Sequence, residues 1–214
     1  MKSFTEFFEE TKMIAILRGI PSDKLTDVLD AIYDGGIRLA EITYDRTGSV
    51  SDGETAQNIK RAATHTEGRM YIGAGTVLTE KQVSLTGEAG GSFIISPDTN
   101  PHVIKATKDA GLWSLPGAMT ISEIVTAHNA GADFVKLFPA DAFGPSYVKA
   151  VLAPLKGIKL VAVSGITPEN IPEYLKAGCV GFGIGSAIAN TALVKEGKLD
   201  AIRENARRYA EACR

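Results

Sequence analysis

The sequence predicts an α/β protein, a (β/α)8 TIM barrel that carries an extra N-terminal helix. Short apolar runs alternate with helical segments along the chain, an order typical of βα units around a parallel sheet. About eight such runs occur, which is the number that a closed barrel requires. Neither a linker nor a shift in composition interrupts them, so we expect residues 1–214 to form a single domain. A doubly wound open sheet is the alternative architecture.

The predicted elements follow one another in a regular order. The opening segment, residues 1–10, is rich in acidic and aromatic side chains, and we expect it to be the extra helix. Apolar runs then predict the strands, at Met13–Leu17, Arg38–Thr43, Met70–Gly73, Ser92–Ser96, Leu112–Leu115, Asp133–Phe138, Lys159–Val163 and Val180–Ile184.

The helices between these strands have recognisable start and stop signals. Hydroxyl side chains that can cap a helix are Ser22 before residues 23–33, Thr79 before residues 80–88, and Thr167 before Pro168. The stops are Asp34-Gly35-Gly36, Ala89-Gly90-Gly91 and Ala177-Gly178, whose glycines tolerate positive φ. Each stop lies shortly before the next apolar run, as a right-handed βα progression requires.

Charge and composition exclude several kinds of partner. The net charge is −2 and both signs are interspersed, so neither nucleic acid nor an anionic membrane surface is expected as a partner. No apolar run reaches the roughly 18 residues of a membrane span, and the opening segment carries acids where a secretory signal is apolar. Cys179 and Cys213 lie far apart without CxxC spacing, which suits a reducing compartment. We therefore expect a cytoplasmic protein.

The three histidines do not predict a metal site. His65, His102 and His128 fall in predicted helices, without the spacing of metal ligands and without a converging pair of carboxylates. We expect neither a metal ion nor another cofactor.

Lys136 stands in the middle of an apolar run, Phe134–Phe138, that is typical of a strand covered on both faces. Lysine is rarely buried without a partner, and burial lowers its pKa and leaves a free amine able to attack a carbonyl. The position therefore favours a Schiff-base lysine. The alternative is a lysine at a strand end whose head reaches water. Phe134 and Phe138 share its face by alternation, and we expect them to keep the amine dry.

Glu41 is the predicted partner of this lysine. Strand alternation places Glu41 and Thr43 on one face of the second run. An inward-pointing carboxylate is expected to meet Lys136 and to act as general acid and base. A structural ion pair with Lys136, or an outward-facing surface carboxylate, is the alternative.

Further candidates follow from the rule that a barrel carries its active site at the C-terminal ends of its strands. Arg18 follows the first run and can bind a substrate carboxylate or hold Glu41 in place. Thr76, after the third run, can donate a hydroxyl hydrogen bond or serve a turn. Pro97 follows the fourth run, and Phe138 ends the sixth.

Glycine-rich turns end the last two predicted strands, at Ser164-Gly165 and at Gly185-Ser186. Backbone N–H groups in such turns form anion-binding concavities, and the loops after strands seven and eight are the usual phosphate site of a barrel. We therefore expect a phosphate to bind here. The order Gly-x-Gly-x-Gly at residues 181–185 lacks the spacing of a dinucleotide fingerprint. The alternative is that these glycines only make tight turns.

Short segments resemble the 2-keto-3-deoxy-6-phosphogluconate aldolase family, which includes 4-hydroxy-2-oxoglutarate aldolase and 2-keto-3-deoxy-6-phosphogalactonate aldolase. The matches run in order over nearly the whole chain. They are Ile14-Ala-Ile-Leu-Arg-Gly19, Glu41-Ile-Thr43, Gly73-Ala-Gly-Thr-Val-Leu78, Ile95-Ser-Pro97, Leu115-Pro-Gly117, Val135-Lys-Leu-Phe-Pro139 and Ser164-Gly-Ile-Thr-Pro168.

The resemblance implies a homotrimeric class I aldolase on a (β/α)8 barrel that uses no metal and no cofactor. It assigns the Schiff base to Lys136 and proton transfer to Glu41. It assigns substrate contacts to Arg18 and Thr76, and phosphate contacts to Ser164, Gly165, Gly185 and Ser186.

Two positions depart from the family pattern. The phosphogluconate enzymes of the family resemble Glu-Val-Thr-Leu-Arg-Thr at the second strand, whereas this chain has Glu41-Ile-Thr-Tyr-Asp-Arg-Thr47, so either Asp45 or Arg46 stands at the arginine position. Ser164 replaces the first glycine of the family's Gly-Gly-Ile turn. The segment Ala142-Phe-Gly-Pro-Ser-Tyr-Val-Lys-Ala150 resembles the phosphogalactonate branch.

The resulting hypothesis is retro-aldol cleavage of a 2-keto-3-deoxy-6-phospho sugar acid to pyruvate and glyceraldehyde 3-phosphate, and also of 4-hydroxy-2-oxoglutarate to pyruvate and glyoxylate. Two alternatives remain open. One is a phosphosugar isomerase or epimerase with Glu41 as base and Lys136 acting only by hydrogen bonding. The other is a non-catalytic phosphosugar binder.

Overall fold

A computed structural model describes residues 4–214 of the chain. Residues 1–3, the start of the predicted opening helix, lie outside the described residues. The strands are β1 (Met13–Leu17), β2 (Leu39–Thr43), β3 (Tyr71–Gly75), β4 (Phe93–Ile95), β5 (Trp113–Leu115), β6 (Gly117–Ala118), β7 (Val135–Leu137), β8 (Leu160–Val163) and β9 (Gly181–Ile184).

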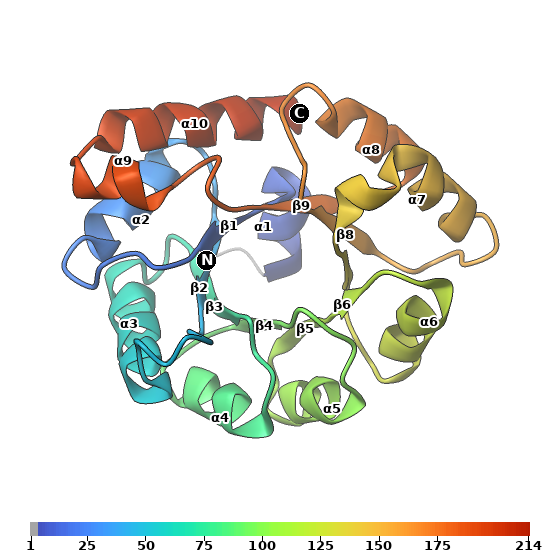
Figure 1. The fold of residues 1–214 in the computed structure, drawn as a ribbon, viewed down its shortest axis with the longest axis horizontal. Helices are drawn as coiled ribbons and strands as arrows, with labels where there is room; N and C mark the ends of the chain where they lie inside the picture. Colours follow the sequence, from blue (N-terminus) through green and yellow to red (C-terminus); the bar gives the residue numbers. More distant parts are fainter. Residues whose placement is uncertain (1–3) are drawn as a thin grey trace.

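All of the helices except α1 lie around the ring of strands and form the outer layer (Figure 1). In chain order the helices are α1 (Phe4–Thr11), α2 (Leu25–Asp34), α3 (Asp52–His65), α4 (Glu80–Glu88), α5 (Pro101–Asp109), α6 (Ile121–Asn129), the 3-10 turn η1 (Ala140–Ala142), α7 (Gly144–Leu152), α8 (Ile171–Ala177), α9 (Thr191–Lys195) and α10 (Leu199–Ala212). Within residues 4–214 no helix is both long and apolar enough to cross a membrane.

The strands form the predicted barrel, and the open-sheet alternative is wrong. The parallel strands run in the order β5-β4-β3-β2-β1-β9-β8-β7-β6, and β5 and β6 are consecutive in the chain with only Pro116 between them. β7 bonds along this whole stretch, because Phe134, Lys136 and Phe138 donate their backbone N–H groups to the carbonyls of residues 114, 116 and 118. Proline has no N–H, so the ladder is interrupted at Pro116, and β5 and β6 together fill one of eight positions in a closed ring.

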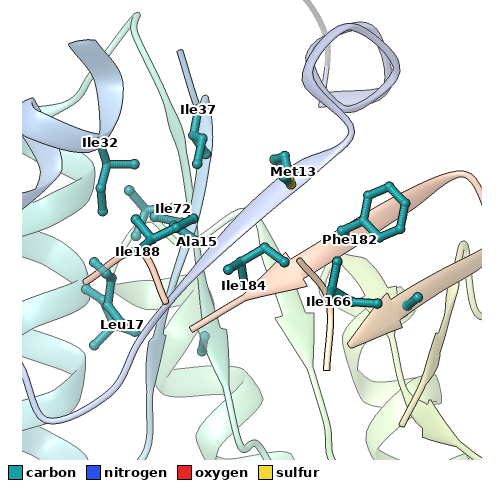
Figure 2. Packing of buried hydrophobic residues seen from close by; sticks show 14 of the residues in the cluster. Met13, Ala15, Leu17, Ile32, Ile37, Ile72, Ile166, Phe182, Ile184 and Ile188 are labelled. Carbon is teal, nitrogen blue, oxygen red and sulfur yellow. The ribbon is translucent and has the colours of Figure 1, made fainter. Parts of the chain in front are cut away.

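Two apolar layers result from alternation along the strands. Outward side chains pack against the helices, as Figure 2 shows for Met13, Ala15 and Leu17 of β1 beside Phe182 and Ile184 of β9. Inward side chains form a second cluster inside the ring, which includes residues 14, 39, 95, 161 and 163. Both faces of each strand are therefore buried, which explains the continuous apolar runs in the sequence.

The extra helix α1 closes one end of the barrel. It lies across the ring in Figure 1, and Phe4 and Phe8 are almost completely buried. The Phe4 ring lies 4.9 Å from that of Trp113, and the Phe8 ring lies 4.7 Å from that of Phe134, measured between centroids. Trp113 opens β5 and Phe134 immediately precedes β7, so α1 seals the N-terminal end and leaves the C-terminal end of the strands open.

Most of the predicted helix signals are confirmed. The Thr79 side chain accepts a hydrogen bond from the Gln82 N–H, and the stops at Gly36, Gly90 and Gly178 have φ of 101°, 83° and 111°. The Ser22 cap is wrong. α2 starts after Lys24 without a side-chain cap, because Ser22 Oγ donates instead to Asn58 Oδ1 of α3, at 2.6 Å.

The start of α8 is also corrected. The helix begins at Ile171 rather than at Pro168, and residues 168–170 form a separate turn before it. The Thr167 backbone N–H donates to Asn170 Oδ1, at 2.9 Å, so this segment is held by the asparagine side chain.

Candidate active site

Glu41 and Lys136 face one another across the interior of the barrel. Glu41 lies on β2 and Lys136 on β7, and three strand positions separate these strands either way round the ring. Glu41 pairs in register with Ile16 and Gly73, and Lys136 with Gly117 and Val161. Both side chains lie on the inward face of their segments, by alternation with Leu39 and Phe134 of the inner apolar cluster.

Glu41 is a buried carboxylate with incomplete hydrogen bonding. It is 2% exposed, and its Oε2 has no hydrogen-bond partner among the described residues. Burial raises the pKa of Glu41 to about 7, against the opposing charges of Lys136 and Arg18. Near neutral pH this group is therefore present both as an acid and as a base.

Lys136 is a buried amine, as the sequence predicts. It is 8% exposed, and burial lowers its pKa. The Glu41 carboxylate opposes that shift, and the Arg18 charge adds to it. No ion pair joins Lys136 to Glu41, so the structural ion pair considered from the sequence does not form. Both pKa shifts increase the share of neutral amine and protonated acid.

The two neighbouring phenylalanines have different surroundings. The Phe138 ring centroid lies 4.8 Å from Lys136 Nζ, but the side chain is 38% exposed. It forms a rim above the amine rather than the predicted dry wall. Phe134 packs with α1 in the inner apolar layer below.

A cavity of about 640 Å³ opens at the C-terminal end of β1, β8 and β9. Six of the predicted site residues line it: Arg18, Phe138, Ser164, Gly165, Gly185 and Ser186. Glu41 and Lys136 do not line it. They lie beneath it, since Ile16, the register partner of Glu41, is part of its wall, and Phe138 is two residues from Lys136.

A second cavity, of about 460 Å³, lies between the loops that follow β1 and β2. Arg18 borders both cavities, whereas Thr76 lines only this second one. Pro97 lines neither of these two cavities, and its carbonyl packs against Gly117. The structure thus divides the predicted substrate contacts between two hollows joined at Arg18.

The loop after β2 contains the two candidates for the family's arginine position. The Asp45 carboxylate accepts hydrogen bonds from the backbone N–H groups of Thr47 and Val50 and from the Thr47 hydroxyl, which lowers the pKa of Asp45 to about 2. Asp45 therefore organises its own loop. Both residues line the second cavity, and Arg46 is exposed.

Sequence reasoning missed part of the cavity wall. Ile16, Val163, Asn190 and Thr191 also line the larger cavity. Asn190 is the N-cap of α9, and its side chain accepts from the Leu193 N–H. An asparagine-threonine pair at a helix start beyond the last strand is a signal that could have pointed to it.

The donor groups of the described residues do not converge as a metal site would require. No group of three or more histidine, cysteine, aspartate and glutamate side chains is placed to hold a metal ion within residues 4–214. His65 instead contacts Asp30, at 2.9 Å, and His102 and His128 are exposed on α5 and α6.

A closed βα barrel with a desolvated lysine opposite a carboxylate of near-neutral pKa, beneath a cavity at the strand C-termini, defines an enzyme of the lysine-dependent aldolase type. The family model "KDPG and KHG aldolase" matches residues 4–205. The chain belongs to the KDPG and KHG aldolase family, and it is a carbon-carbon lyase.

Several relatives extend this comparison. The chain is 38% identical over 175 residues to 2-dehydro-3-deoxy-6-phosphogalactonate aldolase of Escherichia coli K12, covering 81% of this chain and 82% of the relative. It is 35% identical over 180 residues to the probable 2-dehydro-3-deoxy-6-phosphogalactonate aldolase of Rhizobium meliloti, covering 84% and 82%.

Solved structures share the fold. The native KDPGal structure is 34% identical, with a TM-score of 0.85 and coverage of 94% of this chain and 93% of that chain. A KDPG aldolase from Legionella pneumophila, solved with pyruvate captured as a covalent carbinolamine intermediate, is 24% identical. Its TM-score is 0.84, with coverage of 96% and 97%, so this likeness supports the fold.

Proposed function

We propose that this chain cleaves a 2-keto-3-deoxy-6-phospho sugar acid, of the galactonate or gluconate type, to pyruvate and glyceraldehyde 3-phosphate by class I chemistry. The observation that carries the proposal is the buried Lys136 amine facing the buried Glu41 carboxylate beneath an open cavity. The 38% identity to a phosphogalactonate aldolase supports the same substrate class.

Lys136 is the proposed nucleophile. Its neutral amine, favoured by burial, adds to the C2 carbonyl of the substrate to give a carbinolamine. Glu41 donates a proton to the carbinolamine hydroxyl, which leaves as water and gives the protonated imine. A covalent lysine imine supplies the electron sink, so the proposed mechanism uses neither a metal ion nor another cofactor.

Glu41 is the proposed proton carrier for the following steps. As the C3–C4 bond breaks, its electron pair moves to the iminium nitrogen and forms an enamine, while the C4 hydroxyl gives its proton to the carboxylate and becomes the aldehyde. The same carboxyl then protonates C3, and hydrolysis of the imine releases pyruvate and the free Lys136 amine. A pKa near 7 suits a group that gives and takes protons in turn.

The two cavities support a division of the substrate contacts. Ser164, Gly165, Gly185 and Ser186 form the proposed phosphate site in the larger cavity, where Phe138 is a rim contact. Arg18, which borders both cavities, and Thr76 are proposed to contact the keto-acid end. Arg46 rather than Asp45 is proposed for the family's arginine role, because Asp45 is bound within its own loop. Pro97 stays a proposed contact only through its position after β4.

Borohydride reduction with pyruvate tests the covalent step. We expect mass spectrometry of a peptide digest to locate the reduced pyruvate adduct at Lys136, and activity to survive EDTA. Absence of an adduct, with turnover of a phosphosugar by isomerisation, would support the isomerase or epimerase alternative. Binding of sugar phosphates without turnover would support the non-catalytic binder.

A substrate panel with pyruvate detection distinguishes the possible keto acids. It contains the 2-keto-3-deoxy-6-phospho derivatives of galactonate and gluconate, their unphosphorylated forms, and 4-hydroxy-2-oxoglutarate. We expect the highest kcat/KM for a phosphorylated acid and slower release of pyruvate from 4-hydroxy-2-oxoglutarate. Preference for an unphosphorylated acid would contradict the proposed phosphate site.

We also propose that the enzyme works as a homotrimer in the cytoplasm. Exposed apolar side chains at the start of α6 and before α7, Ile121 at 47% and Phe143 at 55%, support self-association. The two cysteines are free and buried, which suits a reducing compartment. Light scattering after size-exclusion chromatography tests the trimer, and Phe143→Ser should weaken it. Fractionation of the source cells tests the location.

A further inference from the structure

The turn after β8 contains a serine in a conformation that glycine adopts more easily. Ser164 has a φ of 87°, in the left-handed region that disfavours residues with a Cβ. Two other non-glycine residues of the described chain share this feature, Lys12 and Thr76. Ser164 also lines the larger cavity, and its hydroxyl has no hydrogen-bond partner among the described residues. The strain is therefore not offset by a contact of the hydroxyl within the protein.

Contacts from outside hold this turn in place. Asn170 Nδ2 donates to the Gly165 carbonyl, at 2.8 Å, and Asn170 Oδ1 accepts from the Thr167 N–H, at 2.9 Å. The Tyr209 hydroxyl donates to the Ile166 carbonyl, at 3.1 Å. A Cβ on Gly165 would overlap the Asp141 side chain, which packs against the turn. Strained backbone persists where the surroundings over-determine it, as they do here.

Asn170 is used in an unusual way for its position. It is the N-cap of α8, where an asparagine side chain commonly accepts from an N–H of the first helical turn. This side chain makes no such bond and instead joins residues 165 and 167. The Asn170 side chain therefore fixes the turn beside the cavity and leaves the N-terminus of α8 without a side-chain cap.

We propose that Ser164 is a specificity-determining residue and that Asn170 is its positioning residue. The Ser164 hydroxyl, and not only the backbone of the turn, donates a hydrogen bond to an anionic oxygen of the ligand in the larger cavity. The ligand class is a phosphoryl group, so the proposal rests on the proposed function for its substrate. The strain at Ser164 is then offset by a bond that forms only when the ligand is bound.

Two substitutions of Ser164 distinguish the effect of its hydroxyl from the effect of the backbone strain. Ser164→Ala removes the hydroxyl and keeps the Cβ, whereas Ser164→Gly removes both. Both variants should lower the ratio of kcat/KM for the phosphorylated acid to that for its unphosphorylated form by about tenfold, mainly through KM. Only Ser164→Gly should raise the melting temperature, by about 2 °C. Ser84→Ala, on the exposed face of α4, is the matched control and should change neither quantity.

Asn170→Asp tests the positioning role. It keeps the acceptor for the Thr167 N–H and loses the donor to the Gly165 carbonyl, so the same ratio should fall. Combining it with Ser164→Ala should add little further loss, because both changes act on one hydrogen bond. Full additivity would contradict the positioning role and leave Asn170 as a structural residue.

A binding measurement keeps the test independent of turnover. Calorimetric titration with inorganic phosphate should show about tenfold weaker binding to Ser164→Ala than to the wild type. Equal phosphate affinity and an unchanged substrate ratio in Ser164→Ala would overturn the proposal. Failure of the proposed function would appear differently, as a wild-type enzyme that forms no pyruvate adduct at Lys136.

Discussion

The Glu41 carboxylate occupies the space that a side chain at position 75 would need. Gly75 ends β3, next to β2, and a Cβ built there overlaps the Glu41 carboxyl group. The carboxylate thus fits inside the barrel because residue 75 has no side chain, and not because a hydrogen bond holds it there. This arrangement leaves Oε2 available to a substrate.

Replacing Gly75 tests this relationship. Gly75→Ala should displace Glu41, lower kcat by about a hundredfold or more, and reduce the free energy of unfolding by about 1–3 kcal/mol. Gly87→Ala is the matched control. Gly87 lies in α4, and a Cβ at this residue makes only an ordinary 3.8 Å contact with the Leu112 side chain. It should stabilise the protein by about 0.5–1 kcal/mol and leave kcat unchanged. Steady-state kinetics and urea unfolding provide both quantities, and an active Gly75→Ala enzyme would contradict the steric role.

The raised pKa of Glu41 should appear in the pH dependence of stability. This pKa moves from 4.5 to about 7 on folding, so between these values the folded state binds more protons than the unfolded state. The free energy of unfolding should therefore fall as pH rises from 4.5 to above 7. Relative to the wild type, Glu41→Gln should gain stability on the order of 3 kcal/mol at pH 8 and much less near pH 4.5. Urea unfolding across this range measures the difference, and a constant difference would refute the assignment.

Lys136→Met should separate catalysis from folding. The substitution removes a desolvated amine and keeps the length of the side chain, so stability should be equal or higher. Activity should fall by more than about a thousandfold, and borohydride with pyruvate should leave no adduct. Circular dichroism and thermal melting check the fold. Substantial residual activity in this variant would exclude the covalent mechanism.

The aromatic seal at the opposite end predicts a change in stability without a change in chemistry. Phe8→Ala removes a buried ring that packs on Phe134 and Gly181, and should reduce the free energy of unfolding by about 3–5 kcal/mol. KM should not change at temperatures where the variant is folded, because α1 lies at the end away from the cavities. Phe7→Ala, on the partly exposed face of α1, should cost much less. A large KM change in Phe8→Ala would show that the two ends are coupled.

Part of the site was predictable because it depends on local periodicity. Apolar runs predict strands, alternation predicts that Glu41 and Lys136 point inward, and the barrel rule places glycine-rich turns at the active end. The Ser22 cap was wrong because this side chain has a distant partner, Asn58 of α3, instead of capping α2. The predicted helix start at Pro168 was wrong because residues 168–170 form a turn that Asn170 holds, and α8 begins at Ile171. The first of these choices depends on groups that the chain brings together only on folding.

The sequence by itself determined the order of the βα units, the inward faces of the strands and the identity of the buried lysine, because each is a pattern within one short segment. The tertiary structure alone decided that Glu41 and Lys136 stand on opposite sides of the ring without an ion pair. It also decided that Arg18 borders two cavities. In the loop after β2, it decided that Asp45 is bound within its own loop while Arg46 is free to meet a ligand. The physical reason is that burial, charge-charge interaction and steric exclusion depend on distances between segments, which are set when the barrel closes.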